Sequence, residues 1–392
     1  MQTQRLYYED SHMRTFEGTV LDCRPAKKGF DIALDRTCFF PEGGGQYGDR
    51  GSLRPLAGGE VVPIRHTHEA DGVIWHEADS PLDPGTRVAG ELDWPLRFAR
   101  MQCHSGEHIA SGLFHTLHGL DNVGFHLGDE EMTIDLSGPV TWADVQEVER
   151  RANAAVALDL PVEARFPDPA ELAEMDYRSK LELTQDVRIV TIPGVDRCAC
   201  CAPHVQRTGE IGLIHFISLQ NWKGGVRLRL LCGSRAVEDV MAKQHSVGEI
   251  SNLLSAKQGE VAGAVTRLLG ELEQAKAKAS ALGRQAAQAM ADALPEPIGD
   301  PIFFTQLDTD ALRALVNAAV DKGAGICAAF AQQGDRWQYI LGSAQTDLRP
   351  LAKEMNAALS GRGGGSAQMV QGSVTAGREE IAAWWAGRQR GE

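Results

Sequence analysis

The chain has 392 residues, of which 43% are hydrophobic and 23% charged. This is the composition of a globular protein with two to four domains, and no apolar run is long enough to cross a bilayer. The formal net charge of −14 argues against a protein that coats nucleic acid by bulk attraction, although it allows a local basic surface.

Two further features indicate a cytoplasmic protein. The N-terminal residues lack the apolar core of a signal peptide. The eight cysteines gather around one region instead of lying at the spacings of a disulfide framework, and this favours metal binding in a reducing compartment.

The first 93 residues predict a small β-barrel domain. Short strand patterns at 16–23, 30–34 and 72–76 are separated by Gly and Pro, as in small barrels and sandwiches. Within this domain, three consecutive glycines at 43–45 can adopt backbone conformations closed to other residues and allow close approach of the main chain to a ligand. A glycine turn between two strands is the simpler interpretation.

A helix expected from Pro95 to about His115 carries the first chemical motif. Residues four apart lie on one helix face, so His104 and His108 can direct two imidazole nitrogens at one point. An isolated pair of this kind is more often an ordinary helix feature. The motif gains weight from Cys200 and His204, which have the same spacing nearly a hundred residues later. The four residues together predict one zinc site.

The surrounding residues, 94–236, predict a mixed α+β domain. Helical periodicity at 141–158 begins with a capping-box pattern at Thr141 and Asp144. Strand patterns occupy the rest of the domain, at 125–128, 132–136, 187–192, 211–217 and 226–231.

The C-terminal part divides into a long helix and a small domain. Apolar residues step by three and four from Val265 to Ala293, which predicts a long helix over 237–294 with a heptad seam for close packing on itself or on a partner chain. Residues 295–392 alternate strands with helices, as in a small α/β domain. We expect a loop at 361–366, rich in glycine, which could bind phosphate through its backbone N–H groups or simply be flexible.

Taken as a set, these motifs resemble the long form of the free-standing alanyl-tRNA editing proteins, the AlaX group. The resemblance covers nearly the whole chain. It rests on the glycine-rich motif at 40–51, the split zinc motif of His104, His108, Cys200 and His204, the stretch 208–212, and a tail that looks like the C-terminal domain of alanyl-tRNA synthetases. The second half-motif departs from the commoner Cys-Gly-Gly-Thr-His form, so Cys198 or Cys201 could compete with Cys200 as a ligand.

The resemblance implies a hydrolase of protein biosynthesis that removes the wrong amino acid from alanine tRNA. The expected substrate is Ser-tRNA(Ala), with Gly-tRNA(Ala) second, and no aminoacylation domain is expected. Glu107, beside the ligand face, is a candidate to position the attacking water. The resemblance places Thr37 and Gln46 in the amino-acid pocket, where a threonine hydroxyl could favour serine over alanine.

The partners are expected to be tRNA and a second copy of the chain. Because net charge opposes RNA binding, the tRNA must meet a local basic surface, for which the candidates are Arg97, Arg100, Lys223, Arg227 and Arg229. We expect homodimerisation through the C-terminal region.

Two other functions remain open at this stage. Four protein ligands leave no open position, so the zinc could be structural in a non-catalytic RNA-binding or dimerisation module. Residues 104–108 also fit the H-x-x-E-H pattern of inverted zinc peptidases, with Glu107 as general base. The peptidase reading does not account for the downstream Cys/His pair or the synthetase-like tail.

Overall fold

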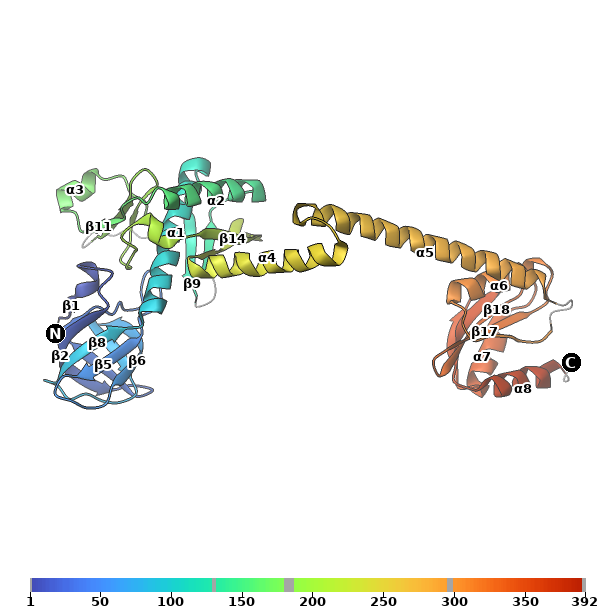
Figure 1. The fold of residues 1–392 in the computed structure, drawn as a ribbon. Coiled ribbons are helices and arrows are strands. Elements are labelled where there is room, and N and C mark those ends of the chain that lie inside the picture. The colour runs from blue at the N-terminus through green and yellow to red at the C-terminus, as the bar shows by residue number, and fades with distance from the viewer. Residues whose placement is uncertain (1, 129–131, 180–186, 295–298, 390–392) are drawn as a thin grey trace. The chain divides into compact units, whose positions relative to one another are not determined.

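The computed structural model describes residues 2–128, 132–179, 187–294 and 299–389. The chain forms two compact units, Met1–Ser246 and Val247–Glu392. The architecture is α+β, with a closed six-stranded barrel near the N-terminus (Figure 1). Among the described helices, none combines the length and the apolar character needed to span a membrane. The finer division into four domains stays a prediction.

The barrel closes because each strand directs alternate side chains inward. Its strands are joined antiparallel in the order β2-β3-β7-β6-β5-β8. Val20, Ile32, Leu53, Ile64 and Val88 fill the interior and are almost fully buried. The bounds are β2 Thr15–Pro25, β3 Phe30–Leu34, β5 Gly51–Pro55, β6 Val62–Ala70, β7 Val73–Ala78 and β8 Arg87–Leu92. The short strands β1 (Gln4–Arg5) and β4 (Arg36–Thr37) pair beside the barrel, next to the 3-10 turn η1 (Leu6–Tyr8).

The glycine motif forms a turn between β4 and β5, as the simpler interpretation predicts. Gly43 and Gln46 exchange backbone hydrogen bonds, and Gly44 and Gly45 have φ angles of 59° and 82°. A Cβ on Gly45 would lie 2.6 Å from Cδ1 of Phe125. Glycine is therefore required where this turn packs against the second half of unit 1.

Helix α1 (Trp94–His118) is the axis of the rest of unit 1. Asp93 caps its start by accepting from the Leu96 amide, and Gly119 ends it in the left-handed conformation at φ 66°. The helix is three residues longer at its C-terminal end than the predicted limit of His115. It packs against α2 (Trp142–Ala157), whose predicted capping box between Thr141 and Asp144 is confirmed.

Two antiparallel sheets complete unit 1. One has the order β14-β15-β10-β9 and contributes with α1 and α2 to a shared apolar core. The other has the order β11-β12-β13 and leads into the second half-motif. The bounds are β9 Asn122–Leu127, β10 Met132–Leu136, β11 Glu163–Arg165, α3 Pro169–Glu174, β12 Ile189–Ile192, β13 Asp196–Ala199, η2 Thr208–Ile211, β14 Ile214–Trp222 and β15 Gly225–Cys232.

The prediction of one continuous helix over 237–294 is wrong. The structure has α4 (Ser234–Leu254) and α5 (Val261–Asp292), separated by a break that contains the 3-10 turn η3 (Gln258–Glu260). Ser255 adopts a left-handed φ of 49°, and this conformation ends α4. The predicted seam residues Leu268 and Leu272 of α5 are about half exposed, at 50% and 47%.

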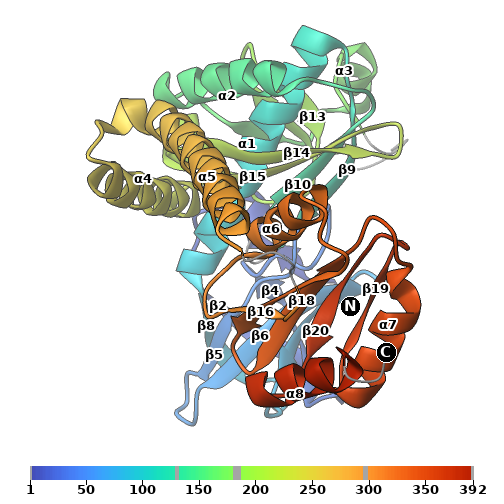
Figure 2. The ribbon, with the colours of Figure 1, turned by 90° about the vertical axis from the view of Figure 1, so that its right-hand side faces the viewer.

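Unit 2 contains a five-stranded sheet in the order β16-β17-β18-β20-β19 with helices α6, α7 and α8. The predicted loop at 361–366 is instead edge strand β19, next to β20 (Figure 2). A Cβ on Gly363 would lie 2.3 Å from the Gln371 carbonyl oxygen, so the glycines permit close strand pairing. The bounds are β16 Ile302–Phe304, α6 Thr309–Asp321, β17 Cys327–Gln333, β18 Arg336–Gly342, α7 Leu348–Ala358, β19 Arg362–Gly365, β20 Met369–Val374 and α8 Arg378–Gln389.

Candidate metal centre and active site

Three imidazoles and one thiol come together where α1 meets the loop after β13. His104 and His108 project from one face of α1, while Cys200 and His204 come from that loop. One nitrogen of each imidazole and the Cys200 sulfur lie within 4.8 Å of one another. Cys200 Sγ is 3.5 Å from His104 Nε2 and 3.4 Å from His204 Nε2. This is a donor set that could hold a metal ion.

A second layer of polar groups orients each imidazole. His104 Nδ1 lies 3.1 Å from Gln46 Oε1, and His108 Nδ1 lies 2.9 Å from Asp196 Oδ2. His204 Nδ1 lies 3.1 Å from Ser105 Oγ. Because these partners occupy the Nδ1 atoms, they leave the Nε2 atoms for the centre of the cluster, as is usual for histidines that bind metal.

The protonation states favour Cys200 over its two neighbours as a ligand. Burial raises the pKa of Cys200, but the charge of His104 and the hydrogen bonds with His104 and His108 outweigh it and hold this pKa well below its ordinary value. Burial raises the pKa of Cys201 to about 11, and it also raises the pKa of Cys198. Thiolate is the form that binds metal, so the charge distribution selects Cys200.

The same environment keeps His204 ready to donate a lone pair. Burial lowers the pKa of His204 to about 3, so its ring is neutral near pH 7. Burial by itself would raise the pKa of Asp196, but His108 and Arg178 hold this pKa below its ordinary value. Asp196 is therefore a buried carboxylate that accepts from both neighbours.

A cavity of about 530 Å³ opens onto this cluster. His104, His108 and Cys200 form part of its wall. The remaining lining residues belong to η1, the glycine turn, the middle of α1, β9, the residue after β11, the segment 178–179, and the residues in or next to β12 and β13: Tyr8, Gly44, Gly45, Glu107, Val123, Gly124, Phe125, Phe166, Arg178, Ser179, Arg188, Cys198, Ala199 and Cys201.

Glu107 lies in this wall and is only 3% exposed, in contrast to an ordinary surface glutamate of a helix. Its Oε1 accepts hydrogen bonds from Ser111 Oγ, at 2.7 Å, and from Asn122 Nδ2. Its Oε2 lies 3.9 Å from His108 Nε2. The first two contacts hold Oε1 in place, and Oε2 faces the His108 ring.

The two residues expected in the amino-acid pocket are placed differently. Gln46 is next to the cluster, where it supports His104, and its Nε2 is buried without a hydrogen-bond partner among the described residues. Thr37 is fully buried, and its hydroxyl is held between His76 Nε2, at 2.9 Å, and the Phe39 amide. Neither residue is among the described residues that line the cavity, so the arrangement does not support substrate contact by Thr37.

Arg97 and Arg100, expected to contact tRNA, are instead buried in unit 1. Arg97 is 1% exposed, and its Nε donates to both carboxylate oxygens of Asp49, at 3.0 and 2.8 Å. Arg100 Nη1 donates to the carbonyl of Gly48 at 2.9 Å. Both arginines attach α1 to the barrel and have no free surface on which to meet RNA.

The other three basic candidates lie on the hairpin of β14 and β15. Lys223 is exposed at its tip, with a left-handed φ of 46°. Arg227 forms a bidentate salt bridge to Asp135, in which Nε and Nη2 donate to Oδ1 and Oδ2 at 2.6 and 2.7 Å. Its guanidinium carbon lies 3.9 Å from the centroid of the Trp222 ring. Arg229 is half-buried on the same strand face as Arg227, as predicted.

The sequence patterns did not identify several residues of the site. Asp196 could have been found, because a carboxylate so close to a ligand motif is a common support for a metal-binding histidine. Ser105, Asn122 and Arg178 give no such signal, since their roles depend on contacts across 15 to 99 residues: Asn122 with Glu107, Arg178 with Asp196 over 18, and Ser105 with His204.

Comparison with known proteins identifies the class first. Residues 187–229, which include Cys200 and His204, match the family described as the threonyl and alanyl tRNA synthetase second additional domain. An alanine–tRNA ligase of Pyrobaculum calidifontis is 32% identical over 388 residues, covering 94% of this chain but 42% of the ligase. The chain thus spans less than half of that ligase.

Relatives of similar length then show the family. The alanyl-tRNA editing protein AlaX-L of Pyrococcus horikoshii is 28% identical over 396 residues, 96% of each chain. The alanyl-tRNA editing protein Aarsd1 of Mus musculus is 32% identical and aligns with 67% of each chain. The chain belongs to the family of alanyl-tRNA editing proteins. A C-Ala domain structure from Aquifex aeolicus alanyl-tRNA synthetase matches 22% of the chain and 86% of that domain, at 18% identity and a TM-score of 0.20.

Proposed function

We propose that this protein is a trans-editing hydrolase, which deacylates mischarged alanine tRNA at a zinc-containing site. The preferred substrate is Ser-tRNA(Ala), and Gly-tRNA(Ala) is the second. Membership of the editing family supports the reaction. The observation that carries the proposal is the cluster of His104, His108, Cys200 and His204, of which the first three line a cavity.

The donor distances fit zinc. With Zn–S near 2.3 Å and Zn–N near 2.0–2.1 Å, a tetrahedral site has a nitrogen–sulfur edge of about 3.5 Å. The two edges between Cys200 Sγ and His104 and His204 are 3.5 and 3.4 Å. A zinc ion held there would supply a Lewis acid close to an ester carbonyl in the cavity.

The protein side chains supply orientation and proton handling. In this proposal Glu107 Oε2, which faces His108, holds the attacking water and accepts its proton; the contacts of Ser111 and Asn122 with Oε1 support this role. Gln46 and Asp196 keep the His104 and His108 rings in position. An aminoacyl ester is activated, so its leaving hydroxyl needs little assistance from an acid.

A second candidate function follows from the same four residues. Three imidazoles and one thiolate form a closed tetrahedral set, which is typical of structural zinc. In that case the protein would bind RNA or dimerise without catalysis. Hydrolysis that depends on zinc and on Glu107 separates the two candidates.

We place the tRNA contact on the hairpin of β14 and β15. Trp222 and Lys223 at its tip, with Arg227 stacked on Trp222, combine an aromatic face with positive charge. Replacing Lys223 and Arg227 by Gln should lower the slope of log affinity against log salt by about one to two and leave zinc content unchanged. Equal slopes in the variant and wild type would locate the RNA elsewhere.

We further propose that the apolar side of α5 pairs with a second copy of the chain. Val265, Leu268, Leu272 and Leu282 are exposed at heptad spacing, at 38–55%. This proposal is independent of the catalytic one.

The decisive experiment is incubation of the purified protein with Ser-, Gly- and Ala-charged alanine tRNA, with release of each amino acid followed over time. We expect Ser to be released fastest and Ala slowest. Glu107→Gln should abolish release while retaining one zinc per chain. Equal release by Glu107→Gln and wild type would exclude the proposed proton acceptor, and no release by the wild type would favour the non-catalytic candidate.

A further inference from the structure

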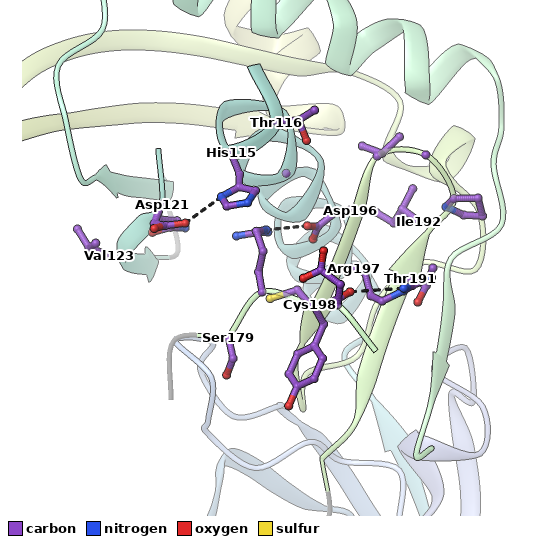
Figure 3. A pocket seen from close by; sticks show the side chains of 18 residues that line it. His115, Thr116, Asp121, Val123, Ser179, Thr191, Ile192, Asp196, Arg197 and Cys198 are labelled. Carbon is purple, nitrogen blue, oxygen red and sulfur yellow. Dashed lines mark hydrogen bonds and ion pairs between the residues drawn. The ribbon is translucent and has the colours of Figure 1, made fainter. Parts of the chain in front are cut away.

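A second and larger cavity, of about 1030 Å³, lies beside the metal cluster in unit 1 (Figure 3). Its wall is built from the end of α1, the start of β9, the segment 176–179 and the strands β12 and β13 with their turn. The four residues of the metal cluster are absent from its described lining. The cavity therefore has no direct part in the chemistry proposed above.

The lining combines hydrogen-bond donors, acceptors and an aromatic ring. Arg178 and Arg197 provide guanidinium donors, Asp121 and Asp176 provide carboxylate acceptors, and Tyr177 provides the ring. A bare phosphate would meet these two carboxylates and also that of Asp196. A nucleoside instead presents hydroxyl and amino donors to carboxylates, and a base that can stack on tyrosine. The chemistry of the wall thus favours a nucleoside.

The two cavities share part of their walls. Val123, Ser179 and Cys198 line both, and Arg178 is the charged member of the shared set. Arg178 Nε donates to Asp196 Oδ1 at 2.8 Å, and Asp196 Oδ2 lies 2.9 Å from His108 Nδ1. Figure 3 shows Asp196 and Cys198 among the side chains that line the larger cavity. A molecule that occupies the larger cavity therefore lies one side chain away from the metal cluster.

We propose that the larger cavity binds the 3′-terminal nucleoside of tRNA, whose ribose carries the ester. Tyr177 stacks on the base, Arg197 contacts the nucleoside from β13, and Arg178 lies in the wall that the two cavities share. This inference rests on the proposed function, because it takes the ester to lie in the smaller cavity.

The test measures binding of uncharged alanine tRNA, so it does not depend on hydrolysis. Fluorescence anisotropy compares intact tRNA with tRNA that lacks its last nucleotide. Loss of one stacked base should weaken binding by the wild type roughly 5- to 150-fold. Tyr177→Ala should bind both RNAs with nearly equal affinity and retain its zinc. Trp142→Ala is the matched control, since Trp142 is an exposed aromatic residue on α2 outside both cavities.

Full discrimination by both Tyr177→Ala and Arg197→Gln would overturn the inference. Binding of adenosine 5′-monophosphate tests whether the cavity takes a free nucleotide instead of the tRNA end. If this nucleotide binds tightly and removal of the last tRNA nucleotide has no effect on tRNA binding, the inference is also overturned. The proposed function fails separately, through absence of Ser-tRNA(Ala) deacylation by the wild type. Discrimination lost in Tyr177→Ala but kept in Trp142→Ala supports the nucleoside site.

Discussion

Replacement of Asp196 by Asn tests whether the layer behind the imidazoles determines metal affinity. Asp196 Oδ2 contacts His108 Nδ1 at 2.9 Å, and its Oδ1 accepts from Arg178 at 2.8 Å. The carboxylate is only 2% exposed. Asparagine has one acceptor oxygen in place of two, so an amide N–H must then face either the His108 N–H or the Arg178 guanidinium. Supports of this kind typically contribute 10- to 100-fold in metal affinity.

Because both oxygens are used, we expect the upper end of this range, about 100-fold or roughly 2.7 kcal/mol. The assay is competition for zinc with a chromophoric chelator. His115 and Asp121 provide the control, since they form the same contact at 2.9 Å but are 49% and 65% exposed. Asp121→Asn should retain wild-type affinity. Zinc affinity of Asp196→Asn within twofold of wild type would refute the reasoning.

Three further outcomes are expected. Cys200→Ala should lose zinc and deacylation together, whereas Cys201→Ala should retain both; full zinc occupancy in Cys200→Ala, measured by elemental analysis, would remove this ligand. Burial lowers the pKa of His76 from 6.5 to about 4. As the pH falls from 6.5 to 4, His76 therefore binds a proton in the unfolded chain before it does so in the folded protein. The free energy of unfolding should be highest above pH 6.5 and should fall by about 3 kcal/mol over this range. Denaturant unfolding at both pH values should show this loss in the wild type and not in His76→Gln. Leu268→Glu with Leu272→Glu should halve the solution mass measured by light scattering if α5 is the dimer contact, and an unchanged dimer would contradict that proposal.

Local patterns were sufficient to predict the α+β class, the N-terminal barrel and two helices of unit 1. Helical spacing and capping signals place α1 and α2 within a few residues, because those features depend on neighbours three or four positions away. The break between α4 and α5 was not predicted, because the apolar steps begin only at Val265, beyond the break that Ser255 and η3 mark. The glycines at 363–365 were misread for a similar reason: their small size serves pairing with β20, a partner outside the local pattern.

The site was predictable where one spacing determines one geometry. His104 and His108 must share a helix face, and the structure brings Cys200 and His204 to the same point. Charge was a poorer guide to the tRNA-binding residues, because the sequence shows that a residue is an arginine but not which carboxylate it pairs with. The charge of Arg97 is balanced by Asp49, 48 residues earlier in the chain. From the sequence alone, the buried Arg97 could not be distinguished from the exposed Lys223 as a candidate for tRNA contact.

The buried arginines also attach the barrel to α1, the helix that carries His104 and His108. Asp49 holds Arg97, and the Gly48 carbonyl holds Arg100, so the segment after the glycine turn fixes the first turns of α1. Gln46, in the same segment, reaches His104 itself. A shift of this segment would move the support of a metal ligand and the base of its helix together. The glycine turn and the residues that follow it therefore support the candidate metal cluster, even though none of the barrel strands contributes a residue to the described cluster.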